Sequence, residues 1–485
     1  MFVFLPITFV GFLVLRKSNH TTPLILWLIA ASLFFYGWWN PKYLLLILSS
    51  ITVNYVIGRW LNTFIKYPTA YRRAVLIIGI AFNLSLIAYY KYAGFFISNL
   101  NAITRFDIQI ETIVLPLAIS FFTFQQISYL VDSYKLETRR YPFLPYCLYV
   151  TFFPQLIAGP IVYHKEALPQ FLGNALKSNA FENFAIGISI FIIGLAKKIL
   201  IADNLALYAT PVFDSAQNGQ TISFFNAWTG TLAYTFQLYF DFSGYSDMAI
   251  GLARLFGIKL PFNFNSPYKA LSIVDFWRRW HMTLSRFLRD YLYIPLGGNR
   301  HGPARRLINI MITMLLGGLW HGASWTFVIW GGLHGLYITI NVLWRRFAMT
   351  TALGNYESLL FYKSLAAVIT FMAVVISWVF FRAESFDAAI SIILGLIGQN
   401  HLGTPDLIGF SMIACAALIA FMAPNSQTWM NLQQPLSDAA PAQPVSMHFI
   451  KPWQAVRSYA VIFASLGFAS IYMLRNTSEF LYFQF

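Results

Sequence analysis

Three of the eight histidines lie where an imidazole could take part in proton transfer. They are His281, His321 and His334. His321 lies deepest, within the apolar run from Leu315 to Trp325. Because a polar group in hydrocarbon is costly unless it is hydrogen-bonded, such a position favours a functional histidine. A satisfied core histidine is the alternative.

The chemistry that suits such a histidine is general-base catalysis. An imidazole with a pKa near neutrality can remove the proton of a hydroxyl as that hydroxyl attacks an acyl carbon. A thioester donor brings a good leaving group, so a base together with stabilisation of the oxyanion would be enough, without a metal. Gly317, Gly318 and Gly322 leave space beside His321 for a substrate or for another helix backbone.

The other five histidines have positions for which solvated or capping roles are sufficient. Three are in predicted loops and two follow turns. In chain order they are His20, His164, His301, His401 and His448.

Other kinds of site are not expected from the sequence. There is no H-E-x-x-H or H-x-x-x-H pattern, and His321 and His334 are thirteen residues apart, off a common helical face, so we predict no metal site. Neither a G-x-S-x-G elbow nor a phosphate-binding P-loop is present. The two cysteines, Cys147 and Cys415, have apolar neighbours that would not activate a thiol, and a disulfide framework is excluded.

Charged residues are unusually frequent in the middle of the chain. The segment Asp275–Asp290 holds four arginines, two acids and His281, too many for a lipid-facing span. We predict a short interfacial or re-entrant helix whose arginines stay near the headgroups or pair with the two acids; a surface-lying amphipathic helix is the alternative. Asp241 and Asp247 lie among aromatic residues and could orient a histidine or pair with one of these arginines.

The elements that position these residues are predicted to be membrane helices. Of 485 residues, 58% are apolar and only 11% are charged, so the chain cannot build a water-soluble surface. A helix needs roughly 20 apolar residues to cross a bilayer core, and blocks of about this length recur. The blocks are 23–39, 43–57, 74–90, 113–131, 144–162, 184–201, 359–381, 408–422 and 459–474. The fold class is therefore all-α and polytopic.

The positive charge of the chain is distributed as membrane proteins require. The net charge is +15, and the basic residues flank the predicted spans, where they would face anionic headgroups. This charge therefore does not indicate nucleic-acid binding. Residues 1–15 lack a basic n-region and a cleavage site, and we interpret them as a retained first helix. Arg16 and Lys17, then Arg72 and Arg73, follow alternate spans, which predicts an amino terminus outside the cytoplasm.

The chain has no visible repeat or long soluble insertion, so we treat residues 1–485 as one membrane domain. From 236 to 337, polar residues are interleaved with aromatics and glycines, a pattern typical of a cavity lining, and this is the expected catalytic core. Five prolines between 424 and 452 predict a loop.

At these residues the sequence resembles the membrane-bound O-acyltransferase family, in its bacterial alginate O-acetyltransferase branch. The resemblance is carried by QLYFDFSGYSDMAIG, DFWRRWHMTLSRFLRDYLYIPLGGNR and LLGGLWH. Further matches are LPLAISFFTFQQISYLVDSY, FFPQLIAGP and the last six residues. Coverage extends over most of residues 1–345 and is weaker beyond.

The resemblance implies about 11–12 transmembrane helices, with re-entrant helices, around a central funnel or tunnel in the bacterial inner membrane. It implies that His321 is the catalytic histidine and that His281 occupies the family's second catalytic position. It further implies that an acyl thioester, acetyl-CoA or a loaded carrier protein, is a co-substrate and that no cofactor is bound. The acetyl group would pass to a polysaccharide, or first to a periplasmic acetyltransferase partner.

Two readings from other functional classes are weighed against an enzyme. A transporter that passes acyl groups or glycans would show internal repeats and paired broken helices, and neither is visible. A scaffold subunit of an export complex would be favoured by the loss of His281 or His321, and both are present. Among acceptors, an alginate-like exopolysaccharide is favoured over peptidoglycan or cellulose by the resemblance.

Overall fold

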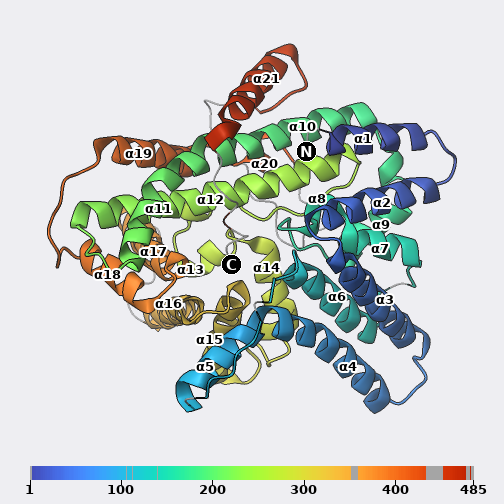
Figure 1. Ribbon diagram of the computed structural model, residues 1–485, viewed down its shortest axis with the longest axis horizontal. Helices are drawn as coiled ribbons and strands as arrows, with labels where there is room; N and C mark the ends of the chain where they lie inside the picture. Colours follow the sequence, from blue (N-terminus) through green and yellow to red (C-terminus); the bar gives the residue numbers. More distant parts are fainter. Residues whose placement is uncertain are drawn as a thin grey trace. The chain divides into compact units, whose positions relative to one another are not determined.

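The computed structural model describes residues 3–104, 106–111, 113–138, 140–350, 359–432, 452–476 and 481. Within these ranges all regular secondary structure is helical, which confirms the predicted fold class (Figure 1). The α-helices are α1 Phe4–Leu15, α2 Thr22–Trp39, α3 Lys42–Thr63, α4 Thr69–Ile87, α5 Ala93–Thr104, α6 Ile119–Tyr134, α7 Phe143–Thr151, α8 Phe153–Leu156, α9 His164–Leu172, α10 Ala180–Ala196, α11 Asp203–Gln217, α12 Phe224–Leu255, α13 Ile273–Trp277, α14 Met282–Leu288, α15 Gly302–His321, α16 Trp325–Thr350, α17 Leu360–Arg382, α18 Phe386–Leu396, α19 Leu407–Met422, α20 Ser426–Trp429 and α21 Arg457–Tyr472.

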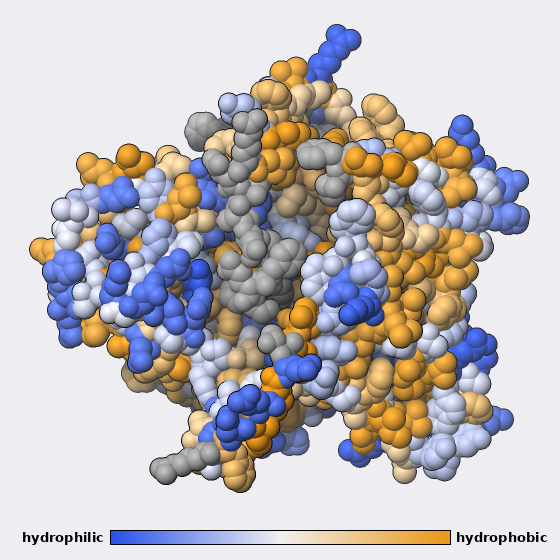
Figure 2. Space-filling view, viewed as in Figure 1, coloured by the Kyte–Doolittle hydropathy of each residue, from blue (hydrophilic) through white to orange (hydrophobic). Residues whose placement is uncertain are grey.

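Six helices in the described ranges are long and apolar enough to cross a bilayer, so the chain is a multi-pass membrane protein. They are Thr22–Trp39, Lys42–Thr63, Thr69–Thr104, Ala180–Gln217, Trp325–Ala348 and Leu360–Arg382. Three further apolar helices, α1, α18 and α19, are shorter. Large apolar side chains on these helices face outward, and Figure 2 shows the resulting broad hydrophobic areas of surface. Trp38 and Leu360, each 80% exposed, are examples of side chains that lipid would cover.

Two of the long helices contain a π-helical turn. Ala88–Tyr92 joins α4 to α5, and Lys197–Ala202 joins α10 to α11. A π turn widens the helix and re-aims the side chains that follow it, and such turns are frequent at functional sites. The second turn contains Lys198, a buried lysine in the middle of an apolar helix.

One apolar block begins its helix later than predicted, and another was wrongly predicted as a single helix. Residues 113–116 have no regular structure, and α6 begins only at Ile119. The block 144–162 is interrupted after Thr151, because Pro154 lacks an amide hydrogen and can only stand in the first turn of a new helix, α8. Nearly all residues of α6 and α7 are buried, so their apolar character comes from packing against protein.

The chain folds into two compact units. The first contains the described residues up to Phe191, together with Ser246–Pro261. The second contains Ile192–Tyr245, Phe262–Leu432 and the described residues after 452. Most of the loop predicted between 424 and 452 lies outside the described residues; of its start, residues 426–429 form α20.

Candidate functional site

His321 is the last residue of α15, where that helix packs closely against α16. Gly318 and Gly331 make this approach possible, because a Cβ on Gly318 would collide with the carbonyl oxygen of Phe327 and one on Gly331 with that of Met314. The glycines near His321 were predicted to make space for a substrate or for another helix backbone. Gly318 makes space for the backbone of α16. A Cβ on Gly322 would collide with the ring of Phe327.

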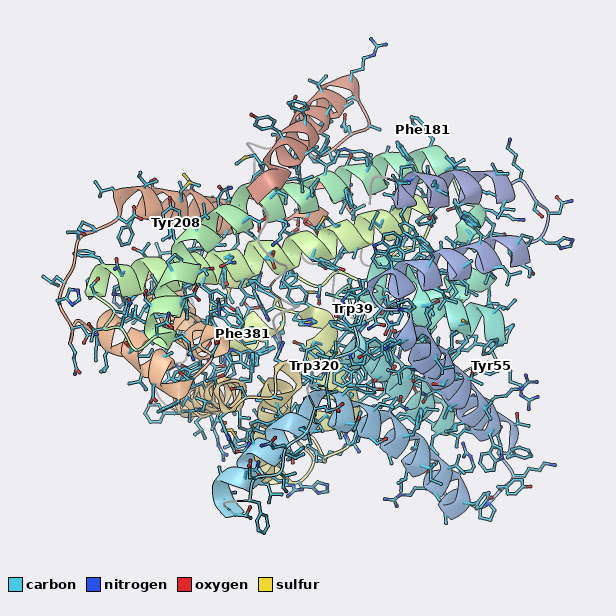
Figure 3. The ribbon with its side chains drawn as sticks, in the orientation of Figure 1. Trp39, Tyr55, Phe181, Tyr208, Trp320 and Phe381 are labelled. Carbon is cyan, nitrogen blue, oxygen red and sulfur yellow. The ribbon has the colours of Figure 1, made fainter. Side chains whose placement is uncertain are left out.

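The His321 imidazole is enclosed by aromatic rings. The ring centroids of Trp320, Trp330 and Phe381 lie 4.9, 5.1 and 5.0 Å from that of His321. These rings come from α15, α16 and α17, and Figure 3 labels Trp320 and Phe381. Only 6% of His321 is exposed. The enclosure excludes water, so a proton transfer at this imidazole would take place in surroundings of low dielectric constant.

His281 lies in the turn between α13 and α14, and the helix predicted over Asp275–Asp290 is therefore wrong as a continuous element. Residue 281 has a φ of +41°, in the left-handed region that interrupts an α-helix. A non-glycine residue held there is strained, and such strain gathers at functional sites. The imidazole is 1% exposed, and its Nδ1 lies 3.0 Å from Oδ1 of Asn263.

The two histidines share one aromatic neighbour. The ring of Trp320 lies 6.3 Å from that of His281 and 4.9 Å from that of His321, centroid to centroid. The ring of Phe242 on α12 covers His281 at 4.8 Å. Residues 40 positions apart in the sequence are thus gathered around the indole of Trp320.

Burial controls the charge of His281. The residue belongs to a segment whose helices are too short to cross a bilayer, and desolvation lowers its pKa from 6.5 to about 3. The imidazole is therefore neutral at physiological pH. A neutral imidazole carries a proton on one nitrogen and a lone pair on the other, so it can accept one hydrogen bond while it donates another.

His334 has a structural role. Its Nδ1 accepts from the indole Nε1 of Trp277 at 3.2 Å, and its Nε2 lies 2.9 Å from the hydroxyl of Ser377, whose own proton goes to the carbonyl oxygen of Val374. Because an indole nitrogen only donates, both ring nitrogens of His334 are committed to the protein. The third histidine singled out by the sequence is thus a satisfied core residue.

The acids of the central region have identifiable partners. Arg279 pairs with Asp275 at 2.9 Å and Arg289 with Asp290 at 2.7 Å, so the two predicted acid partners are the observed ones. The predicted pairing of Asp241 with an arginine of the Asp275–Asp290 segment is not observed. Its carboxylate lies 2.6 Å from Nζ of Lys198.

Lys198 is a residue that sequence reasoning missed. Besides Asp241 it pairs with Asp203, at 2.7 Å, and both carboxylates are buried. The signal was available, because a lysine inside an apolar run of spanning length needs a partner.

His164 was assigned a solvated or capping role, and this assignment is wrong. The side chain is completely buried, and its Nε2 lies 2.9 Å from Oδ2 of Asp132 on α6. The pair belongs to the first compact unit. The signal that could have found it was Asp132, an acid that immediately follows an apolar block.

The described residues do not bring together three or more His, Cys, Asp or Glu side chains as a metal site would require. Cys147 is buried and Cys415 is exposed, and both are free thiols. The imidazoles of His281 and His321 both lie beside Trp320, and the amide of Asn263 contacts His281.

Comparison with known proteins gives consistent matches over this region. The model of the membrane-bound O-acyltransferase family matches residues 95–386, more than half of the chain, including both histidines. The peptidoglycan O-acetyltransferase of Helicobacter pylori is 46% identical over 82% of this chain and 79% of its own length. The probable alginate O-acetylase AlgI of Pseudomonas aeruginosa is 43% identical over 80% of this chain and 72% of its own length. The corresponding protein of Pseudomonas putida is 37% identical over 100% of this chain and 98% of its own length.

Proposed function

Because the chain belongs to the membrane-bound O-acyltransferase family and is an O-acetyltransferase within it, we propose that it moves acetyl from a cytoplasmic thioester to a hydroxyl of an extracytoplasmic polysaccharide, with His321 as general base. The observation that carries this proposal is the pairing of His321 and His281 about Trp320, inside the matched region. Both imidazoles are buried among aromatic rings, where a base and a substrate can meet without competing water.

The chemical step needs only groups that the site and the substrates supply. The acceptor oxygen attacks the thioester carbonyl carbon while His321 takes the hydroxyl proton. The tetrahedral intermediate collapses as the carbon–sulfur bond breaks, and the protonated His321 returns the proton to the leaving thiolate. The products are an O-acetyl ester and a free thiol. Acetyl-CoA is the proposed donor, and an acylated carrier protein is the alternative.

The acceptor is proposed from what the relatives are named for. The relatives compared above are named for two classes, peptidoglycan and alginate, at 46% and 43% identity. Sequence analysis favoured an alginate-like polysaccharide, and the match over almost the full length of both chains is to a probable alginate O-acetylase. The higher identity is to a peptidoglycan enzyme. We retain an alginate-like exopolysaccharide as the proposed acceptor, with peptidoglycan as the second candidate, reached directly or through a periplasmic acetyltransferase.

The decisive experiment measures glycan O-acetylation in cells that lack the native protein. The cells are complemented with wild type, His321→Ala, His281→Ala or His20→Ala, with membrane levels matched by immunoblot. His20 lies in an exposed loop and is the control. We expect His321→Ala to insert normally and to lose acetylation, and His20→Ala to behave as wild type.

Two outcomes would count against the proposal. If His321→Ala acetylates as well as wild type, the assignment of the base fails, and a transporter or scaffold role becomes the better explanation. Ester-linked acetate is measured separately on purified peptidoglycan and on exopolysaccharide. Loss confined to peptidoglycan would refute the alginate-like acceptor and leave the acyl transfer itself intact.

A further inference from the structure

Asn263 holds the second histidine in place through its side-chain oxygen. The residue lies in the connection between α12 and α13 and is 1% exposed. Its Oδ1 lies 3.0 Å from Nδ1 of His281, 3.0 Å from the hydroxyl of Thr283 and 3.4 Å from the backbone nitrogen of Thr283. The backbones are joined as well, since the amide of Met282 donates to the carbonyl oxygen of Asn263 at 2.9 Å.

These contacts determine which way the amide of Asn263 is turned. A backbone N–H can only donate, so the atom that faces the amide of Thr283 has to be the oxygen of Asn263 and not its nitrogen. The same oxygen faces His281. A hydrogen bond between them therefore requires a proton on Nδ1 of His281.

The other nitrogen of His281 then carries the lone pair. Within the part of the chain that the structure describes, Nε2 of His281 is buried and has no hydrogen-bond partner. The amide nitrogen of Asn263 is in the same situation. A buried polar atom without a partner calls for an explanation, and a bound substrate that supplies the missing hydrogen bond is one such explanation.

We propose that Asn263 is a positioning residue of the acyl transfer, which holds His281 in the neutral tautomer protonated on Nδ1 and so presents Nε2 to the substrates as a hydrogen-bond acceptor. The inference rests on the proposed function. The two histidines then have different roles. His321 takes the proton of the attacking hydroxyl, whereas His281 accepts a hydrogen bond from another N–H or O–H of the bound substrates.

The competing explanation is that Asn263 only stabilises the turn between α13 and α14. The left-handed conformation at His281 needs support, and the bonds from Thr283 to Asn263 would supply it without any effect on the imidazole. A test therefore has to report the tautomer itself, as well as activity. Thr283→Val offers a matched control, because it removes one hydrogen bond to Oδ1 of Asn263 and leaves the bond to His281.

The tautomer can be read from the ¹⁵N chemical shifts of histidine in the full-length protein, labelled and reconstituted in lipid bilayers. The signals of His281 are identified by their disappearance in His281→Gln. We expect wild type and Thr283→Val to show protonated Nδ1 and unprotonated Nε2. Asn263→Ala is expected to show a mixture of tautomers, with kcat lowered about tenfold or more.

Asn263→Asp gives an independent measurement in case Asn263→Ala does not fold. A carboxylate keeps the acceptor and stabilises the imidazolium, so it raises the pKa of His281. Since the protonated ring can no longer accept through Nε2, we expect the acidic limb of the kcat profile to move to higher pH, with kcat approaching the wild-type value on the alkaline side.

Several results would overturn the inference. They are a proton on Nε2 of His281 in wild type, an unchanged tautomer and kcat in Asn263→Ala, or an unmoved acidic limb in Asn263→Asp. Failure of the proposed function would be seen differently. If His321→Ala remained active, the acyl-transfer mechanism would be wrong, whatever the spectrum of His281 showed.

Discussion

At the scale of single residues, burial alone does not distinguish a functional histidine from a structural one. His281, His321 and His334 are all at least nine-tenths buried. What differs is the set of hydrogen-bond partners of their ring nitrogens. His334 uses both nitrogens on Trp277 and Ser377, whereas His281 uses one on Asn263 and keeps Nε2 for another partner.

This difference predicts that His334→Ala affects stability and not catalysis. The change leaves a cavity between aromatic rings and removes the acceptor of the Trp277 indole, so we expect a loss of about 2–4 kcal/mol in the free energy of unfolding. Thermal unfolding in detergent measures the loss. Activity per folded molecule should stay near that of wild type, and a normal melting temperature with an inactive folded protein would contradict the structural role.

At the scale of elements, the site depends on how closely α15 and α16 approach. His321 ends α15 and Trp330 lies on α16, so the aromatic enclosure forms only when the two helices pack together. Gly318 and Gly331 allow the backbones to touch, whereas the Cβ of an alanine at Gly332 would meet only Leu315, at an ordinary distance of 3.5 Å.

Gly318→Ala is therefore expected to destabilise the protein and to lower acetylation. The added methyl collides with a backbone carbonyl that cannot move aside without shifting α16, and overpacking of this kind costs about 1–3 kcal/mol. Gly332→Ala on the same interface is the matched control and should change stability by less than about 0.5 kcal/mol. Equal melting temperatures for the two variants would show that the helix contact is not needed.

At the scale of the whole molecule, composition places the chain in a membrane, and the distribution of charge predicts its direction. Six described helices satisfy the length and hydropathy of a span. Arg16 and Lys17 follow α1, and Lys66 lies between α3 and α4, whereas Asn40 lies between α2 and α3. The distribution of basic residues predicts that Lys66 faces the cytoplasm and that Asn40 faces the outside.

Single cysteines test this orientation. In a background of Cys147→Ala and Cys415→Ala, Asn40→Cys should react with a membrane-impermeant maleimide in intact cells, because the predicted orientation puts the connection between α2 and α3 outside. Lys66→Cys should react only after the cells are opened. The reverse pattern would place the amino terminus in the cytoplasm.

The sequence by itself determined the class of the protein and the family resemblance, and it predicted two site residues, His281 and His321. Long apolar runs require a bilayer, and a span is a local property that about 20 consecutive residues define. His321 could be singled out because its neighbours in sequence are apolar, and His281 because it lies in a motif with an unusual density of charge. The pairs Arg279–Asp275 and Arg289–Asp290 were also predictable, since each is made within one turn of chain.

The tertiary structure decided what depends on residues far apart in the chain. The partner of Asp241 is Lys198, 43 positions earlier, and that of His164 is Asp132, 32 positions earlier. Asn263, 18 positions before His281, determines its tautomer. The break at His281 inside 275–290 also depended on packing, because a buried segment can exchange helical hydrogen bonds for contacts with other elements. Burial and hydrogen-bond partners are properties of the folded chain, and local sequence constrains them only weakly.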